Sequence, residues 1–302
     1  MLLKPAIIQA LFVGFSKMFQ DSLTATPTDY EKIATVVQSS TKSNTYGWLG
    51  QFPQYREWIG DRVINDMAAS GYSIVNKDWE STVAVKRTDI EDDNVGVYAP
   101  LFSEMGRAAK SHPDEMVFNL LKQGRSTLCF DGQFFFDTDH PVYAKTDGTG
   151  TASVVSNCDV DLTARPNNPV WYLLDTTRAL KPIIFQDRKK PVLQSITDIE
   201  SENVFMRNEF LFGTDARNNV GYGFWQLAYA SNQPLTPENY AKARAAMKAF
   251  KADGGRPLGV TPNLLVVPSS LEGAGRKILI KDESGGNEWA GSATLLESSW
   301  LG

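Results

Sequence analysis

Apolar residues recur with the spacing of one helical face in three stretches of the chain. Near the start they fall at i, i+3, i+4 and i+7 while polar residues take the other faces, and this stripe comprises Ile8, Leu11, Phe12, Phe15, Met18 and Phe19. A second stretch runs from about Pro100 to Lys122. Pro113 lies within it and predicts a break or kink, because proline has no backbone N–H to donate.

The third helical stretch is followed by a buried strand. Thr236 is a suitable N-cap, and Pro237 fits the first turn because its φ is preset and its missing N–H is not needed there. One face of this helix then carries Tyr240, Ala243, Met247 and Phe250. We expect Gly254 to end the helix, and the apolar run 264–267, fenced by prolines, to form a strand.

Other strands are predicted where β-branched and aromatic residues gather between turn residues. Two of them, 55–60 and 81–87, would form a ribbon, and the second carries Val83 and Val85 on one face. The remaining predicted strands are 171–174, 182–185, 204–212 and 222–229. Asp131-Gly132 predicts a tight turn before a buried run at 134–136, and 148–157 predicts an exposed loop.

Composition narrows the class of protein. The 302 residues are enough for one large or two ordinary domains, and 42% hydrophobic residues can bury a sizeable core. A formal net charge of −5 argues against sequence-specific DNA binding. No apolar run approaches the roughly 18–20 residues of a membrane span. The apolar start resembles a secretion signal only faintly, because Pro5 interrupts it.

Few residues could carry chemistry. Cys129 and Cys158 have neither metal-site nor disulfide-framework spacing, so we expect two small core residues in a reducing compartment. His112 and His140 are the only histidines, and neither lies near a nucleophile elbow. No phosphate-binding glycine loop is present either. An enzyme using two carboxylates, such as a glycosidase, is a minor alternative.

A metal site is considered at Asp137, Asp139 and His140, because carboxylates and imidazole are suitable ligands. Their spacing matches no established site, and turn chemistry accounts for the same residues. We therefore predict no enzyme, no catalytic or cofactor-binding residue, no cofactor and no metal site.

Several segments together carry a family resemblance. They are 131–136 with His140-Pro141, 170–175, 182–188, 208–213, 216–225 and the helix–strand unit 234–272. In their joint occurrence the chain resembles, over nearly its whole length, the major head (capsid) subunits of Mu-like tailed phages and prophages. The resemblance implies an α+β chain with the Hong Kong 97-like major capsid fold: an N-terminal arm, an extended loop, a spine helix with a peripheral sheet, and an axial domain.

The resemblance also implies a division of the chain. We expect an N-terminal arm at 1–51, an extended β-ribbon loop at 52–95, a peripheral domain with the spine helix at 96–233, and an axial domain at 234–302. A long strand-rich block separates the spine helix from the unit at 234–272, which indicates an insertion, an enlarged peripheral sheet or a rearranged element order. The alternative is an axial domain that begins near residue 145.

The implied function is structural. The subunit would self-assemble, as hexamers and pentamers, into the icosahedral head that encloses the double-stranded DNA genome, with assembly in the bacterial host cytoplasm. A scaffold, a maturation protease and a portal are partners implied by the resemblance, and packaged DNA would be contacted without sequence specificity. The alternative is a soluble ring-forming, tube or baseplate protein.

Contacts between subunits are predicted at the N-terminal helix and the ribbon. Each element has a second interpretation, since the helix could dock on its own domain and the ribbon could be an ordinary hairpin. The hypothesis names Ile8, Leu11, Phe12, Phe15, Phe19, Tyr55, Trp58, Trp79, Val83 and Val85. The basic triplet 188–190 is either a solvated face or a partner for the acidic link 91–93 of a neighbour.

Overall fold

A computed structural model describes residues 5–50, 52, 71–92, 94–146, 148–280 and 287–302. The helices are α1 Pro5–Ala25, α2 Tyr30–Ile33, α3 Arg87–Glu91, α4 Ala99–Lys122, α5 Glu202–Arg207, α6 Pro237–Lys248 and α7 Glu272–Leu279. The strands before α4 are β1 Ala34–Gln38, β2 Ser43–Thr45, β3 Ser73–Val75 and β4 Lys77–Lys86. Those after it are β5 His140–Tyr143, β6 Ala152–Val155, β7 Cys158–Asp159, β8 Trp171–Leu174, β9 Ile183–Ile196, β10 Glu209–Tyr222, β11 Ala228–Ser231, β12 Leu264–Val267 and β13 Thr294–Glu297.

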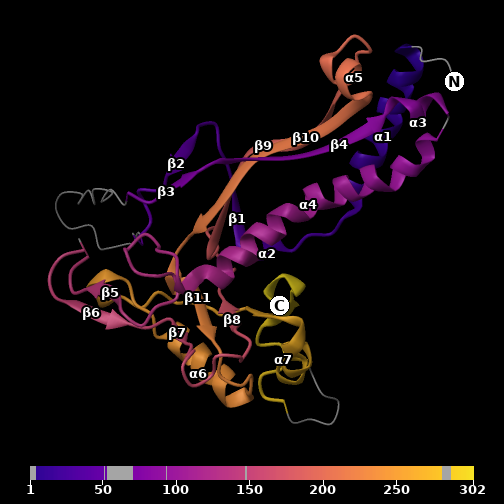
Figure 1. The fold of residues 1–302 in the computed structure, drawn as a ribbon. Helices are drawn as coiled ribbons and strands as arrows, with labels where there is room; N and C mark the ends of the chain where they lie inside the picture. Colours follow the sequence, from indigo (N-terminus) through magenta and orange to yellow (C-terminus); the bar gives the residue numbers. More distant parts are fainter. Residues whose placement is uncertain (1–4, 51, 53–70, 93, 147, 281–286) are drawn as a thin grey trace.

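An elongated sheet and two helices form one arm of the molecule. Its strand order is β1-β9-β10-β4, and β9 and β10 are antiparallel strands of 14 residues each that run alongside α4 and α1 (Figure 1). Along β10, buried positions alternate with half-buried ones because successive side chains of a strand point to opposite faces. One face of this sheet is therefore available to pack on the helices.

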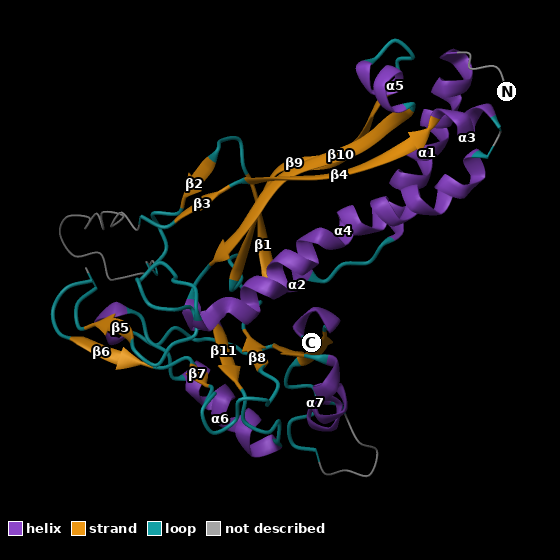
Figure 2. Ribbon diagram, viewed as in Figure 1, coloured by secondary structure: helices purple, strands orange, loops and turns teal. Residues whose placement is uncertain are grey.

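A second sheet forms the broader end of the molecule. Its order is β13-β12-β8-β11-β7, with α6 and α7 close by (Figure 2). Strands β8, β11 and β12 are buried along their whole length, as expected of strands covered on both faces. Two small two-stranded antiparallel sheets, β2–β3 and β5–β6, complete the described sheets.

The buried apolar side chains form two clusters. The smaller lies in the arm between α1, α4 and the elongated sheet, and includes Phe15, Phe102 and Phe212. The larger fills the broad end and includes Trp171, Trp225 and Tyr240. Helix α4 and strands β9 and β10 contribute to both clusters, so these three elements join the two ends of the molecule.

The helix–strand unit of the sequence prediction is confirmed. The Thr236 hydroxyl accepts a hydrogen bond from the Asn239 N–H at 3.3 Å, and strand β12 occupies 264–267 as expected. The predicted end of the helix is wrong, because α6 stops at Lys248. The chain turns there so that Phe250 packs edge-on against Trp225, at a centroid distance of 5.5 Å.

Helix α4 is continuous through Pro113, so the predicted break is wrong. Proline removes one helix hydrogen bond, but side chains on both sides of it are packed, Phe102 and Met105 in the smaller cluster and Phe118 in the larger. The Asp114 carboxylate also accepts hydrogen bonds from the backbone N–H groups of Asp29 and Tyr30, at 2.9 and 2.7 Å. These tertiary contacts fix the helix where proline weakens it locally.

Other local predictions need correction. Residues 204–207 lie in helix α5 rather than in a strand, the acidic link begins inside helix α3, and the loop 148–157 contains β6. In the predicted buried run, Phe135 and Phe136 are buried but Phe134 is 39% exposed. The predicted second strand of the ribbon is confirmed within β4, whose partner is β10; the predicted first strand, 55–60, lies outside the described residues.

The strand-rich block and the C-terminal unit share one sheet. Strand β12 pairs with β8 and with β13, so hydrogen bonds join residues on both sides of the expected boundary at 233/234. Strands β9 and β10 of the same block belong instead to the elongated sheet. The division at 233/234 therefore does not coincide with a break in the hydrogen-bonded structure.

We predict that Leu265→Ala lowers the free energy of unfolding by about 2–5 kcal/mol, because the side chain is fully buried in the centre of the second sheet and its loss leaves a cavity. Leu162→Ala is the matched control, since Leu162 is 55% exposed and should change stability by no more than about 0.5 kcal/mol. Urea unfolding of the unassembled subunit measures both. Equal losses would contradict the assigned core.

Candidate assembly surfaces

Helix α1 packs on α4 and the elongated sheet of its own chain. The Phe15 ring stacks on Phe102 at a centroid distance of 4.1 Å and meets Phe212 edge-on at 5.4 Å. A methyl group at Gly106 would lie 2.2 Å from the Phe19 carbonyl oxygen, so only glycine allows the two helices to approach this closely. The apolar stripe of α1 is thus packed against its own chain, which is the first of the two interpretations that the sequence allowed.

The residues named for contacts between subunits fall into three groups. Ile8, Phe15, Phe19 and Val85 are buried in their own chain. Leu11, Phe12, Trp79 and Val83 are half-buried, so part of each side chain remains accessible. Tyr55 and Trp58 lie outside the described residues. The prediction of inter-subunit contact therefore rests on the half-buried group.

A groove of about 760 Å³ lies between α4, the end of α1 and the elongated sheet. Its apolar lining includes Trp79, Met105 and Ala109, and Lys189 and Asp215 form an ion pair at its edge. The Trp79 ring contacts His112 at a centroid distance of 4.5 Å, and its indole N–H donates to the Asn218 carbonyl at 3.3 Å. Trp79, which the sequence hypothesis named, is thus part of the groove wall.

Helix α5 carries the most exposed large apolar side chains among the described residues. Phe205 is 86% and Met206 70% exposed, and α5 lies at the far end of the β9–β10 hairpin (Figure 1). Two side chains on β9 are also exposed, Val192 at 59% and Ile196 at 49%. Sequence reasoning missed this surface because it assigned 204–212 to a strand. Asn208, which adopts the left-handed conformation at the helix end, is the signal that could have marked the helix.

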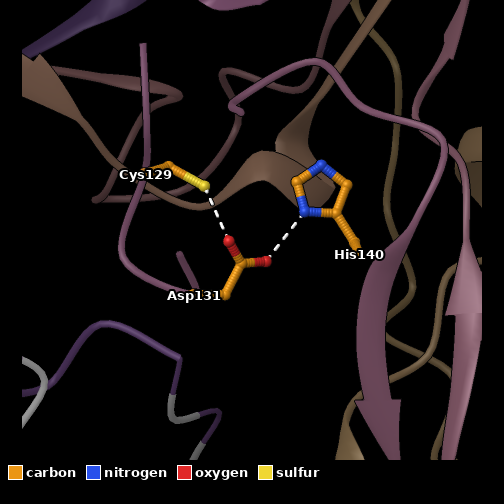
Figure 3. Close-up of side chains that lie close together, drawn as sticks. All are labelled: Cys129, Asp131 and His140. Atoms are coloured by element: carbon orange, nitrogen blue, oxygen red, sulfur yellow. Dashed lines mark hydrogen bonds and ion pairs between the residues drawn. The ribbon is translucent and has the colours of Figure 1, made fainter. Parts of the chain in front are cut away.

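A buried cluster of polar side chains lies in the segment between α4 and β5. The Asp131 carboxylate accepts a hydrogen bond from the Cys129 thiol at 3.0 Å, and its other oxygen lies 2.8 Å from Nδ1 of His140 (Figure 3). Burial works to raise the pKa of Asp131, but the hydrogen bonds from His140, Cys129 and Gln133 outweigh it and lower the pKa. Burial and the Asp131 charge raise the pKa of the Cys129 thiol.

The structure does not assemble the three residues considered in the sequence for a metal. His140 faces Asp131, whereas Asp139 is exposed and interacts with Asp137, which raises the Asp139 pKa. Cys129 and Cys158 are both free and buried, so the expectation of two small core residues is confirmed. Within the described residues, no helix is both long and apolar enough to cross a membrane.

Solved structures of similar fold identify the class of protein. Over 99% of its length the chain superposes on the full subunit of the procapsid of bacteriophage JBD30, with a TM-score of 0.83 and 54% identity. It matches the subunit of the JBD30 capsid over the full length of both chains, with a TM-score of 0.74 and 43% identity. The fold is thus the α+β fold of a phage shell subunit.

The family follows from sequence relatives. Residues 8–301 match the family described as Mu-like prophage major head subunit gpT. The Mu-like prophage FluMu major head subunit of Haemophilus influenzae is 54% identical over 92% of this chain and 90% of that protein. The major capsid protein of Escherichia phage Mu is 48% identical over the full length of both. The chain belongs to the Mu-like major head subunit family, and it is a structural capsid protein rather than an enzyme.

We predict that Phe15→Ala loosens α1 in the unassembled subunit, because removing a buried phenylalanine costs about 3–5 kcal/mol. Protease cleavage within residues 5–25 should become faster, and amide exchange there should increase. Val13→Ala on the same helix is the control, since Val13 is 57% exposed. Unchanged protection in Phe15→Ala would mean that α1 is not held by its own chain in solution.

The partly buried position of His112 predicts an acid-sensitive arm. Burial lowers the pKa of His112, and the Glu115 carboxylate and Asn218 raise it to a smaller extent. The unfolded chain therefore binds the proton more readily, so stability is lost as the pH falls from about 6.5 towards the lowered pKa. His112→Gln should reduce this fall in melting temperature. The difference between the two proteins at about pH 8, where imidazole is neutral, is the baseline; identical profiles would contradict the assignment.

Proposed function

We propose that the chain tiles a closed icosahedral head around double-stranded DNA through repeated contacts between identical copies, and that its fold is Hong Kong 97-like. The observation that carries this proposal is the end-to-end superposition on the JBD30 procapsid subunit at 54% identity. Identical subunits close a shell when each contact is weak alone and many act together. The elongated shape supports this role, because a long arm reaches neighbours that a compact domain cannot.

We assign the domains by the two sheets. The peripheral domain comprises α4 with the elongated sheet, and the axial domain comprises the five-stranded sheet with α6 and α7. Because β8 and β12 are hydrogen-bonded, the axial domain begins with β7 at about residue 158, close to the alternative start near 145, while β9 and β10 within that stretch stay with the peripheral domain. Residues 1–51 are proposed as the N-terminal arm, which adds β1 to the elongated sheet, and 52–95 as the loop that reaches a neighbour, which adds β4 beside β10.

Contacts between subunits are proposed at accessible apolar side chains. Helix α5 presents Phe205 and Met206 at the end of the arm, where nothing in the described part of the chain covers them. Leu11, Phe12, Trp79 and Val83 offer smaller exposed areas along the arm. Large exposed apolar side chains gathered in one place are typical of interaction surfaces.

The proposed partners beyond copies of the chain follow from the family. A scaffold, a maturation protease and a portal would act during assembly in the host cytoplasm. Packaged DNA would be contacted without sequence specificity, which fits a chain whose net charge of −5 lacks the positive excess that holds DNA tightly. The ring, tube or baseplate alternative is distinguished by what the purified chain forms.

Electron microscopy of the purified chain, expressed with and without neighbouring phage assembly proteins, tests the proposal. We expect closed shells or curved sheets of hexamers and pentamers. Uniform monomers or one small ring under both conditions would overturn the proposal and favour the ring-forming alternative.

We predict that Phe205→Ser with Met206→Ser reduces the yield of shells several-fold without lowering the melting temperature of the subunit, because both side chains are exposed in the free chain. Val154→Ser is the matched control, since Val154 is 68% exposed but lies on β6 at the broad end. Shell yield is measured by sedimentation and counted in micrographs. Equal shell yields from the wild type, the Phe205→Ser/Met206→Ser variant and Val154→Ser would exclude α5 as an assembly contact.

A further inference from the structure

The buried cluster of Cys129, Asp131 and His140 has a composition that the assembly role does not explain. The thiol sulfur, a carboxylate oxygen and a ring nitrogen all lie within 4.8 Å of one another. His140 is fully buried and Asp131 is 10% exposed. Three donor atoms of the types that bind transition metals thus converge in the interior of a structural protein.

We propose that Cys129, Asp131 and His140 form a three-ligand site for a divalent cation of the zinc class. Sulfur and imidazole ligands favour Zn²⁺ over Mg²⁺ or Ca²⁺, which take oxygen ligands. The three side chains fill three of the four positions of a tetrahedral site, and a water molecule completes it.

Charge balance supports a cation at this place. Asp131 is a buried carboxylate, and the only basic side chain within ion-pair distance among the described residues is His140. A buried charge is costly unless it is paired. A Zn²⁺ ion with one thiolate, one carboxylate and a neutral imidazole has a net charge of zero, so the loaded site carries no uncompensated charge.

The side chains are also held in place before any ion binds. The His140 ring stacks on Trp225 at a centroid distance of 4.1 Å and an angle of 10°. The Asp131 carboxylate accepts a hydrogen bond from the Gln133 N–H at 3.0 Å, which orients it as an outer partner orients a metal ligand. Gly132, with φ of 84°, allows the turn that brings Cys129 back towards Asp131. The ligand side chains therefore lose little conformational freedom when a metal binds.

Binding requires a simple exchange of protons. The Cys129 thiol loses its proton to solvent, and the thiolate bonds the metal. A neutral imidazole that binds the metal through Nδ1 carries its proton on Nε2, and Asp131 binds as the carboxylate. The metal bonds replace the hydrogen bonds that join Asp131 to Cys129 and His140, and Nε2 has no hydrogen-bond partner among the described residues. One proton is released for each ion bound.

The site would also stabilise the aromatic side chains packed beside it. Phe130 stands between two of the ligands in the sequence, a methyl group at Gly50 would lie 3.0 Å from its ring, and both Phe130 and Phe52 pack against the Phe224 ring. A metal that holds the 129–140 turn rigid would also hold the support on which residues 50 and 52 rest.

Metal content and cobalt substitution of the full chain test the proposal. The chain is expressed in zinc-supplemented medium, purified without chelators and analysed for bound metal. We expect about one zinc per chain in the wild type and in Cys158→Ser, and a loss of most of it in Cys129→Ser. Cys158→Ser is the matched control because it removes the other buried free cysteine.

Replacing the ion with Co²⁺ gives a readout that does not depend on a variant's folding. We expect the near-ultraviolet charge-transfer band of a thiolate–cobalt bond in the wild type, and its loss in Cys129→Ser. A wild type without bound metal or cobalt band, or equal metal in Cys129→Ser, would overturn the proposal and leave a hydrogen-bonded trio only. Shell formation is scored separately by electron microscopy, so failure here leaves the proposed assembly role untouched.

Discussion

The packing of helix α4 against two separate cores is the constraint on which the rest of the structure depends. Phe102 and Met105 near its start belong to the core of the arm, and Val117, Phe118 and Leu121 near its end belong to the core of the broad end. Strands β9 and β10 also contribute to both cores. Because interiors are close-packed, neither core can shift relative to the other without disturbing side chains that the same elements supply.

Sequence predicted elements well where the signal is local. The Thr236 cap with Pro237, the buried run 264–267 and the stripe from Ile8 to Phe19 each depend on neighbours a few residues away, and the structure confirms them. Prediction from the sequence failed where contacts with residues far along the chain determine the local structure. Pro113 should break a lone helix, but Asp114 and the packing on both sides hold it, and the pairing of β4 with β10 depends on a strand far along the chain.

The same limit applies to the candidate sites. The sequence placed His140 with Asp137 and Asp139, its near neighbours, whereas the structure places it with Asp131 across a turn. For α1 the pattern showed an apolar stripe but not which surface covers it, since a helix on its own chain and one on a neighbour need the same residues. The resemblance to a family identified the protein class, because joint motifs carry information that single elements lack.

A fully buried glutamine joins the chain on either side of residues 53–70. The Gln186 amide donates to the Ile74 carbonyl at 3.1 Å and to Asn76 at 2.7 Å, and its oxygen accepts from the Tyr46 hydroxyl at 2.9 Å. Tyr46 precedes that segment and Ile74 follows it, so both attachment points are fixed to β9. The described chain on the two sides of residues 53–70 is therefore joined to β9 by a network whose polar groups are satisfied.

The continuity of α4 has a mechanical consequence. Its 24 residues extend over about 36 Å at 1.5 Å per residue, with one end in each core. A rigid rod of that length is a lever: a tilt of about 10° at the broad end would carry the opposite end through roughly 6 Å. Small repacking around Phe118 and Leu121 would therefore be amplified into a larger displacement at the end of the arm.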